Sequence, residues 1–198
     1  MFLTRMAMDI NRPDTASILA DRARLGAEVD ALMPGMLPLW RLDQIGSRVW
    51  LVMLTRLRPD LLAMHLRYGY PGAFPSWETL SIHDELEELW PGERRYFELT
   101  FSPNGLTDRP DPSFDEPRLR AWLAEQGEHC GFTPTAVDTW SFSWEAVGGR
   151  QLLLARCRGR LRVTDESRFV WAVTHGIGGV REYGAGLMTI ARDGSVWE

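Results

Sequence analysis

The sequence contains no lysine, so all 22 of its basic side chains are arginine. It has only two cysteines, Cys130 and Cys157, which excludes a disulfide scaffold and a cysteine-rich zinc site. No segment approaches the roughly 20 apolar residues that span a bilayer, and residues 1–10 lack the basic region and long apolar run of a signal peptide. No His, Cys and Asp side chains have metal-ligand spacing. These absences predict a cytoplasmic protein that uses no metal or other cofactor.

The overall composition is that of an ordinary core-forming protein, with 44% hydrophobic and 25% charged residues. A length of 198 residues suits one large domain or two small ones. The net charge of −5 argues against indiscriminate binding to nucleic acid. It does not exclude a local basic site, because such a site depends on where the arginines lie along the chain.

The second half of the chain has the clearer order of expected elements. Its strands and helices are predicted at residues 94–101, 118–128, 139–163, 165–175 and 187–191. The segment 139–163 is a hairpin, so the order is strand–helix–strand–strand–helix–strand. That order is typical of a ferredoxin-like domain.

The first half is compatible with the same order. Its elements are expected as a strand at 2–8, one helix at 14–33, strands at 37–42 and 49–55, and short helical segments at 61–66 and 83–89, with a loop at 68–76. We therefore predict an α+β protein of two tandem ferredoxin-like (RRM-like) domains, residues 1–91 and 92–198. Each would be a βαββαβ antiparallel sheet with helices on one face, and the second would carry an arginine hairpin and a glycine-rich loop.

The turn of the hairpin fixes which residues lie opposite each other. Gly148 and Gly149 suit a two-residue type I′ turn, which pairs Val147 with Arg150. Counting back gives an apolar face, expected to pack on the core, on which the pairs are Trp144–Leu153, Phe142–Ala155 and Trp140–Cys157. On the other face the pairs are Ser143–Leu154, Ser141–Arg156 and Thr139–Arg158, and this face continues with Arg160 and Arg162.

This strand face carries four arginines, Arg156, Arg158, Arg160 and Arg162, spaced about 6.6 Å apart. The four guanidinium groups repel one another unless anions or carboxylates lie opposite them. The predicted cross-strand neighbours are the hydroxyls of Ser141 and Thr139 rather than acids. The planar guanidinium fork suits phosphate oxygens and guanine edges. The pattern favours a site for RNA or another anion. The alternative is a solvated strand face neutralised by carboxylates from elsewhere, such as residues 108–116.

A glycine-rich loop joins the last helix to the last strand. It contains five glycines in eleven residues, namely Gly176, Gly178, Gly179, Gly184 and Gly186. Glycine permits positive φ angles and close backbone approach to a ligand, and free amides can cradle phosphate. The helix–loop–strand order excludes a dinucleotide-binding fingerprint, and the Gly-Lys-Ser/Thr element of a Walker loop is missing. A helix cap followed by a tight turn would explain Gly176 alone.

Several segments resemble the CasE family, the CRISPR RNA-processing subunits of type I-E Cascade. They are residues 1–5 (MFLTR), 118–132, 159–165 (GRLRVTD) and the glycine-rich loop with its sequel, 176–188. The resemblance covers nearly the whole chain in the same order. It implies two ferredoxin-like domains, binding of the CRISPR repeat stem-loop, and metal-independent cleavage at the base of the stem. It also implies continued binding of the 3′ handle within Cascade.

The arginine row, the glycine-rich loop and the resemblance together predict which residues bind RNA. They are the four hairpin arginines, the five loop glycines and Arg181, which keeps one of the family's two usual basic positions in the loop. Gly179 stands where the family usually has a basic residue, and the loop after Pro103, often basic in the family, is acidic here. The expected partners are the CRISPR repeat hairpin and the backbone subunits of Cascade, with no membrane.

The catalytic Tyr-x-x-His pair of the family falls on Ala23 and Gly26, where both functional side chains are missing. Metal-free cleavage through the 2′-hydroxyl needs a base and an acid, and general acid–base catalysis contributes about 10²–10⁴-fold. We therefore expect an RNA-holding subunit with impaired or no nuclease activity. Glycine also costs about 1 kcal/mol relative to alanine inside a helix. Gly26 would either let the helix bend or let RNA or a partner approach closely, and the sequence leaves both open.

Two other functions stay open at this point. One is an active repeat endoribonuclease whose catalytic groups have moved, with His175 and Tyr183 as the candidates. The other is a structural interaction protein that has lost RNA binding, which the acidic net charge would favour.

Overall fold

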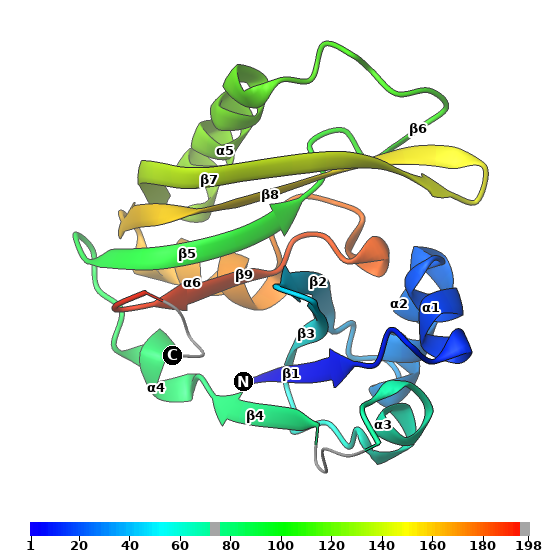
Figure 1. Cartoon of the computed structure of the whole chain (residues 1–198). Coiled ribbons are helices and arrows are strands. Elements are labelled where there is room, and N and C mark those ends of the chain that lie inside the picture. Colours follow the sequence, from blue (N-terminus) through cyan, green and yellow to red (C-terminus); the bar gives the residue numbers. More distant parts are fainter. Residues whose placement is uncertain (72–75, 195–198) are drawn as a thin grey trace. The chain divides into compact units, whose positions relative to one another are not determined.

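A computed structural model describes residues 1–71 and 76–194, so residues 72–75 of the predicted loop 68–76 lie outside the described residues (Figure 1). The internal contacts divide the chain into two units. The first comprises residues 1–84 and 182–184, and the second comprises residues 85–181 and the segment from 185 onward. A domain boundary between residues 91 and 92 stays a prediction.

The first unit is a four-stranded antiparallel sheet with helices. Its elements are β1 (Phe2–Met8), α1 (Pro13–Leu19), α2 (Arg22–Leu32), β2 (Leu39–Ile45), β3 (Arg48–Thr55), α3 (Leu62–Tyr68) and β4 (Trp77–Ser81), and α4 (His83–Glu87) follows. The strand order is β2-β3-β1-β4. This is the ferredoxin-like arrangement, with its core built around Met6, Leu25, Val29, Trp40 and Met53.

Two details of this unit differ from the sequence prediction. The expected single helix at 14–33 is two helices, because Asp21 leaves the helical path and its carboxylate accepts a hydrogen bond from the Arg24 amide at 3.1 Å, which starts α2 anew. The strand β4 was not predicted. Its side chains are mostly half-buried or exposed, so it lacks the apolar alternation that marks a strand in a sequence.

The second unit has the same topology with one added strand. Its elements are β5 (Arg94–Phe101), β6 (Leu106–Thr107), α5 (Glu116–Cys130), β7 (Phe132–Val147), β8 (Arg150–Val163), α6 (Glu166–His175) and β9 (Met188–Ala191). The short 3₁₀ helix η1 (Arg181–Tyr183) begins with the last residue before the segment 182–184, which belongs to the first unit. β8 pairs with β7 along one edge and with β5 and β6 along the other, while β5 also pairs with β9. The order β7-β8-β5-β9 confirms the second ferredoxin-like fold.

The helices of the second unit begin and end where local chemistry requires. Asp115 and Asp165 cap α5 and α6 by accepting the amides of Arg118 and Arg168, each at 3.0 Å. Gly131, at φ 76°, ends α5 in the left-handed conformation that glycine tolerates best. Figure 1 shows both helices on one side of the sheet, which leaves the other face of β5 and β8 uncovered by them. No helix among the described residues is long and apolar enough to cross a membrane.

Candidate nucleic-acid interface

The hairpin of β7 and β8 has the register that the sequence predicts. Val147 lies opposite Arg150, Ser141 opposite Arg156 and Thr139 opposite Arg158. The β8 arginines alternate with the buried residues Ala155, Cys157, Gly159 and Leu161. The predicted row of four arginines on one strand face is therefore confirmed.

The opposite face of the hairpin is less completely buried than predicted. Its β8 members Leu153, Ala155 and Cys157 are fully buried, but Phe142 on β7 is 46% exposed. β7 pairs only with β8, so it is an edge strand with a neighbour on one side only. The prediction that this whole face packs on the core is wrong for Phe142.

An acid that was not expected from the sequence lies next to the arginine row. Glu98 on β5 is directly opposite Arg158. Its carboxylate contacts the guanidinium of Arg156 and lies 3.1 Å from Nε of Arg158. Further along, Nη2 of Arg160 is 4.0 Å from the carboxylate of Asp138. The prediction of hydroxyl neighbours without acids is thus wrong, and these carboxylates come from β5 and β7 rather than from residues 108–116.

These ion pairs divide the row into two parts. The side chain of Arg156 is only 21% exposed beside Glu98, whereas Arg158 and Arg160 are 51% and 52% exposed. Arg162 is also exposed. A solvent-borne anion can therefore reach Arg158, Arg160 and Arg162 more readily than Arg156.

Two residues of the neighbouring strand complete this surface. Arg94 lies opposite Arg162, and Tyr96, which is 37% exposed, lies opposite Arg160. Their side chains alternate with buried Arg95 and Phe97, and this period-two pattern was the signal in the sequence that could have revealed them. We call the surface the arginine face; it consists of Arg94, Tyr96, Glu98, Arg156, Arg158, Arg160 and Arg162.

The arginine face has an unbalanced end. Arg94 and Arg162 are cross-strand neighbours of the same charge, an arrangement that destabilises an antiparallel pair. An anion bound between them would turn that repulsion into two attractions. Tyr96 beside Arg160 adds an aromatic surface of the kind on which unpaired bases stack.

The glycine-rich loop begins and ends near the other end of the row. The Ile177 amide donates to the Gly186 carbonyl at 3.0 Å, and the Gly186 amide donates to the Thr100 carbonyl at 2.7 Å. Thr100 is the cross-strand neighbour of Arg156. The glycine-rich loop and the arginine row, which are separate in the sequence, are thus connected through Thr100 on β5.

Four of the five loop glycines have backbone conformations that other residues rarely adopt. The φ angles of Gly176, Gly178, Gly184 and Gly186 lie between 83° and 89°. Gly179 has an ordinary φ, and nothing lies within 4 Å of the place where its Cβ would be. Gly179 is the loop glycine with room for a side chain.

Residues 182–184, which we call the docked segment, contact α2 and β2 of the first unit. The carbonyl of Glu182 overlaps the place where a Cβ on Gly26 would be, and a Cβ on Gly184 would lie 2.7 Å from the Trp40 ring. The guanidinium of Arg22 donates to the Tyr183 carbonyl at 3.2 Å. Glycine at position 26 therefore admits the close approach of the chain's own backbone.

Neither position that the resemblance assigns to catalysis carries a side chain that can take up or donate a proton. Ala23 is exposed, and Gly26 is buried under the Glu182 carbonyl. One turn further along α2, the half-buried carboxyl of Asp30 has its pKa raised, first by burial and then by the negative charge of Glu182. No imidazole or phenol stands at either position.

The two alternative catalytic candidates lie in different units. His175 belongs to the second unit, where its ring stacks on Trp171 with centroids 4.8 Å apart and its Nδ1 lies 3.1 Å from the Trp171 carbonyl. Tyr183 belongs to the docked segment of the first unit. Their role in catalysis stays a prediction.

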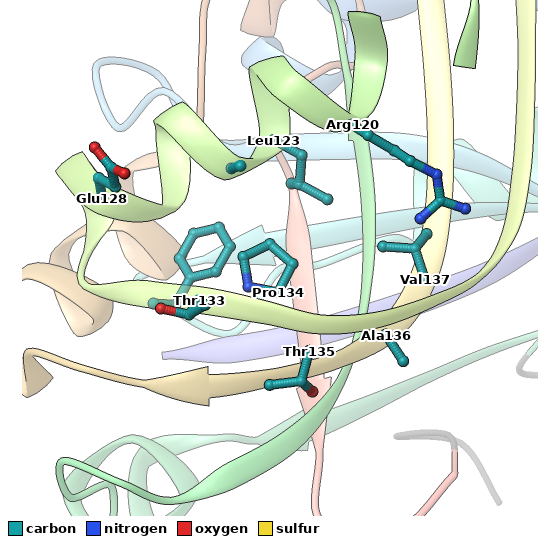
Figure 2. A pocket seen from close by; sticks show the side chains of 10 residues that line it. Arg120, Leu123, Glu128, Thr133, Pro134, Thr135, Ala136 and Val137 are labelled. Atoms are coloured by element: carbon teal, nitrogen blue, oxygen red, sulfur yellow. The ribbon is translucent and has the colours of Figure 1, made fainter. Parts of the chain in front are cut away.

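A pocket of about 310 Å³ lies between α5 and the bulged first part of β7, as Figure 2 shows. Leu123 and Pro134 face this pocket, and Arg120 stands at one end near Val137. Nη2 of Arg120 is 2.6 Å from the carboxylate of Glu116, and its guanidinium lies 5.3 Å from the centre of the Trp140 ring. Because the cation of Arg120 is already paired and the lining also includes the carboxylate of Glu128, this pocket adds little to an anion site.

The model of the CRISPR-associated protein family matches residues 1–192. The chain belongs to this family. No curated protein matches the sequence. Within the described residues, no group of three or more His, Cys, Asp and Glu side chains is placed to hold a metal ion.

Solved structures of CRISPR-associated proteins share the fold over nearly the whole length of this chain. A CRISPR endoribonuclease Cse3 bound to 19-nucleotide RNA superposes with a TM-score of 0.77 at 19% identity, covering 96% of this chain and 100% of that one. Cse3 of Thermus thermophilus bound to an RNA representing a pre-cleavage complex superposes with a TM-score of 0.75 at 21% sequence identity, and the match covers 96% of this chain and 98% of that one. Cas6e of Escherichia coli K-12 superposes with a TM-score of 0.64 at 16% sequence identity, and the match covers 96% of this chain and 99% of that one. Family membership and fold confirm the resemblance to CasE proteins.

Proposed function

We propose that this protein binds the stem-loop of a CRISPR repeat RNA and holds its 3′ end within a Cascade complex, with impaired or no nuclease activity of its own. The observation that carries the binding part is the arginine face, where exposed Arg158, Arg160 and Arg162 follow one strand beside Tyr96. The similarity to Cse3 bound to RNA supports it.

The chemistry of the arginine face fits an RNA backbone better than a protein partner. Guanidinium groups along one strand recur at about 6.6 Å, so successive arginines can contact successive phosphates of one RNA strand. Each such contact releases counterions, which makes binding salt-dependent. The net charge of −5 keeps the rest of the surface unattractive to nucleic acid in general. The arrangement therefore favours selective RNA holding.

The proposed loss of nuclease activity is supported by the two positions on α2 that lack a catalytic side chain. Cleavage through the 2′-hydroxyl needs one group that takes a proton and one that gives a proton to the leaving oxygen. Ala23 and Gly26 can do neither, and the Glu182 carbonyl fills the space beside Gly26. The protein would then depend on another nuclease for processing, or hold RNA that has already been cut.

The expected partners are the repeat hairpin and the backbone subunits of Cascade, in the cytoplasm. A structure of Escherichia coli Cascade bound to double-stranded DNA includes a chain that matches this one with a TM-score of 0.53 at 15% identity. This likeness of fold supports a place in a similar complex.

The experiment is to incubate the purified protein with the repeat RNA of its own CRISPR array. We expect tight binding of the hairpin, with an affinity that falls as salt rises, and no product cut at the stem base. Efficient cutting would overturn the inactive reading, and a His175→Ala variant would then test the alternative with relocated groups. Absence of hairpin binding would overturn the RNA-holding function itself.

A further inference from the structure

A second pocket, in the helical layer of the second unit, has features that the arginine face does not use. Its volume is about 610 Å³, within the range of about 300–1,000 Å³ found for small-molecule sites. Its walls come from the last turn of α5, the outer side of α6 and the start of the glycine-rich loop. The residues that matter here are His129, Arg168, Trp171, Gly178 and Arg181.

The aromatic wall is an indole ring held in place by its own helix. Trp171 is 57% exposed although it is a large apolar side chain on a helix. His175, one turn further along, stacks against it with an angle of 7° between the ring planes. This stack fixes the orientation of the indole while leaving much of it open to solvent. A held, exposed aromatic ring is a platform for a planar ligand.

The polar wall can receive an anion. Arg181 makes no ion pair within the described residues, whereas Arg168 is paired with Asp165 at 2.9 Å. The amides of Gly178 and Gly179 have no hydrogen-bond acceptor in the described part of the chain. The free amides of Gly178, whose φ is 83°, and of the residue after it lie next to an arginine without an ion pair, and together these groups form an anion cradle.

We propose that this pocket binds one nucleotide, with its phosphate on Arg181, on the Gly178 amide that lines the pocket and on the adjoining Gly179 amide, and with its base stacked on Trp171. Phosphate and base are the two parts of a ligand that need a cationic cradle and a planar platform together. The nucleotide can be an unpaired residue flanking the RNA hairpin, which rests on the proposed function, or a free mononucleotide, which does not.

The experiment compares four proteins, namely the unaltered chain, Trp171→Ala, Trp171→Phe and the control Trp90→Ala. Trp90 is matched in type and exposure, at 55%, and does not line the pocket. Each protein is titrated with AMP, with adenosine, with inorganic phosphate, with the blunt repeat hairpin, and with the same hairpin carrying unpaired flanking nucleotides. Melting curves verify that each variant is folded.

We expect Trp171→Ala to weaken binding of AMP or of the flanked hairpin about tenfold, since stacking of one base contributes at that scale. Trp171→Phe should retain most of the affinity, and Trp90→Ala should match the unaltered chain. AMP should bind more tightly than either adenosine or phosphate. A Trp171-dependent effect on the flanked hairpin alone assigns the nucleotide to the RNA, and one on AMP alone assigns it to a free mononucleotide.

The proposal is overturned if Trp171→Ala changes neither AMP binding nor the ratio between flanked and blunt hairpins. It is also overturned if Trp90→Ala has the same effect as Trp171→Ala. Failure of the proposed function is a separate result, because in that case no hairpin binds while the titration with AMP still reports on the pocket.

Discussion

The backbone carbonyl of Glu182 occupies the space into which a side chain on Gly26 would project. All amino acids except glycine carry a Cβ atom, so any substitution of Gly26 must displace α2 or the docked segment. The contact is backbone against backbone, which no change of rotamer can relieve. Gly26 is therefore explained by packing against the chain itself, rather than by a bend in the helix.

Gly26→Ala should destabilise the protein although alanine favours helices by about 1 kcal/mol over glycine. Overpacking in a buried contact costs about 1–3 kcal/mol, so we expect a melting temperature lower by several degrees. The matched control is Gly179→Ala, because Gly179 has an ordinary φ and open space around its Cβ position. An unchanged or raised melting temperature for Gly26→Ala would contradict the contact with Glu182.

Restoring the family's catalytic pair should fail to restore cutting. In the double variant Ala23→Tyr with Gly26→His, the tyrosine has room because Ala23 is exposed, but the imidazole has none beside the Glu182 carbonyl. We expect no product from the repeat hairpin and a lower melting temperature. Ala23→Tyr alone is the control and should leave stability within about 0.5 kcal/mol. Cutting at the stem base by the double variant would mean that the docked segment moves away from α2.

The arginine face should lose RNA affinity unevenly along its row. Alanine at Arg158, Arg160 or Arg162 should weaken hairpin binding and lower the salt slope by about one each, as for a lost phosphate contact. Arg156→Ala should have a smaller effect, because that side chain is 21% exposed and already contacts Glu98. The control is Arg109→Ala, an exposed arginine of the loop before α5. Binding curves at several salt concentrations make the measurement, and equal losses for Arg109→Ala would refute a specific arginine face.

The contrast between Arg156 and Arg158 also indicates what a sequence can and cannot reveal. The register of the hairpin could be derived because the Gly148–Gly149 turn fixes it and the alternation of β8 checks it. Glu98 could not be placed, since it reaches the row through pairing of β5 with β8, across 58 residues of chain. The cap at Asp115 was not predicted, since the helix was expected to begin only at Arg118, and Asp21 was overlooked within a longer helical pattern.

The fate of the catalytic positions illustrates the same limit. Periodicity alone put Gly26 on a helix, and the family resemblance assigned it the place of a histidine. Only the tertiary structure brings residues 182–184 onto α2, from more than 150 positions away in the sequence. Long-range contacts of this kind leave no local signal, apart from the two glycines that permit them.

Glu98→Gln should increase the affinity for RNA. The amide keeps the shape of the side chain but removes the charge that neutralises Arg156 and Arg158. Two guanidinium groups then become available to phosphates, so we expect tighter binding at low salt and a salt slope steeper by about one. Glu125→Gln, at an exposed position on α5, is the control with the same change of charge. Weaker binding by Glu98→Gln would instead mean that the carboxylate orients the arginines for RNA.

The thiol of Cys157 should make the fold sensitive to alkali. Burial, with the nearby negative charge of Glu98, raises the pKa of Cys157 from 9.0 to about 12. The folded state therefore keeps a proton that the unfolded state loses, so this group's contribution is complete below pH 9 and declines above it. The loss is about 1.4 kcal/mol per pH unit until the folded pKa is reached.

Urea denaturation of the reduced protein at pH 8, 9 and 10 measures this effect by comparison with Cys157→Ala. The variant loses some packing at every pH, but it has no thiol to ionise. Its stability should therefore fall less steeply than that of the unaltered chain above pH 9, and the gap between the two should close by about 1 kcal/mol by pH 10. Parallel profiles would show that Cys157 ionises equally in both states, which is incompatible with a thiol sealed beneath the arginine face.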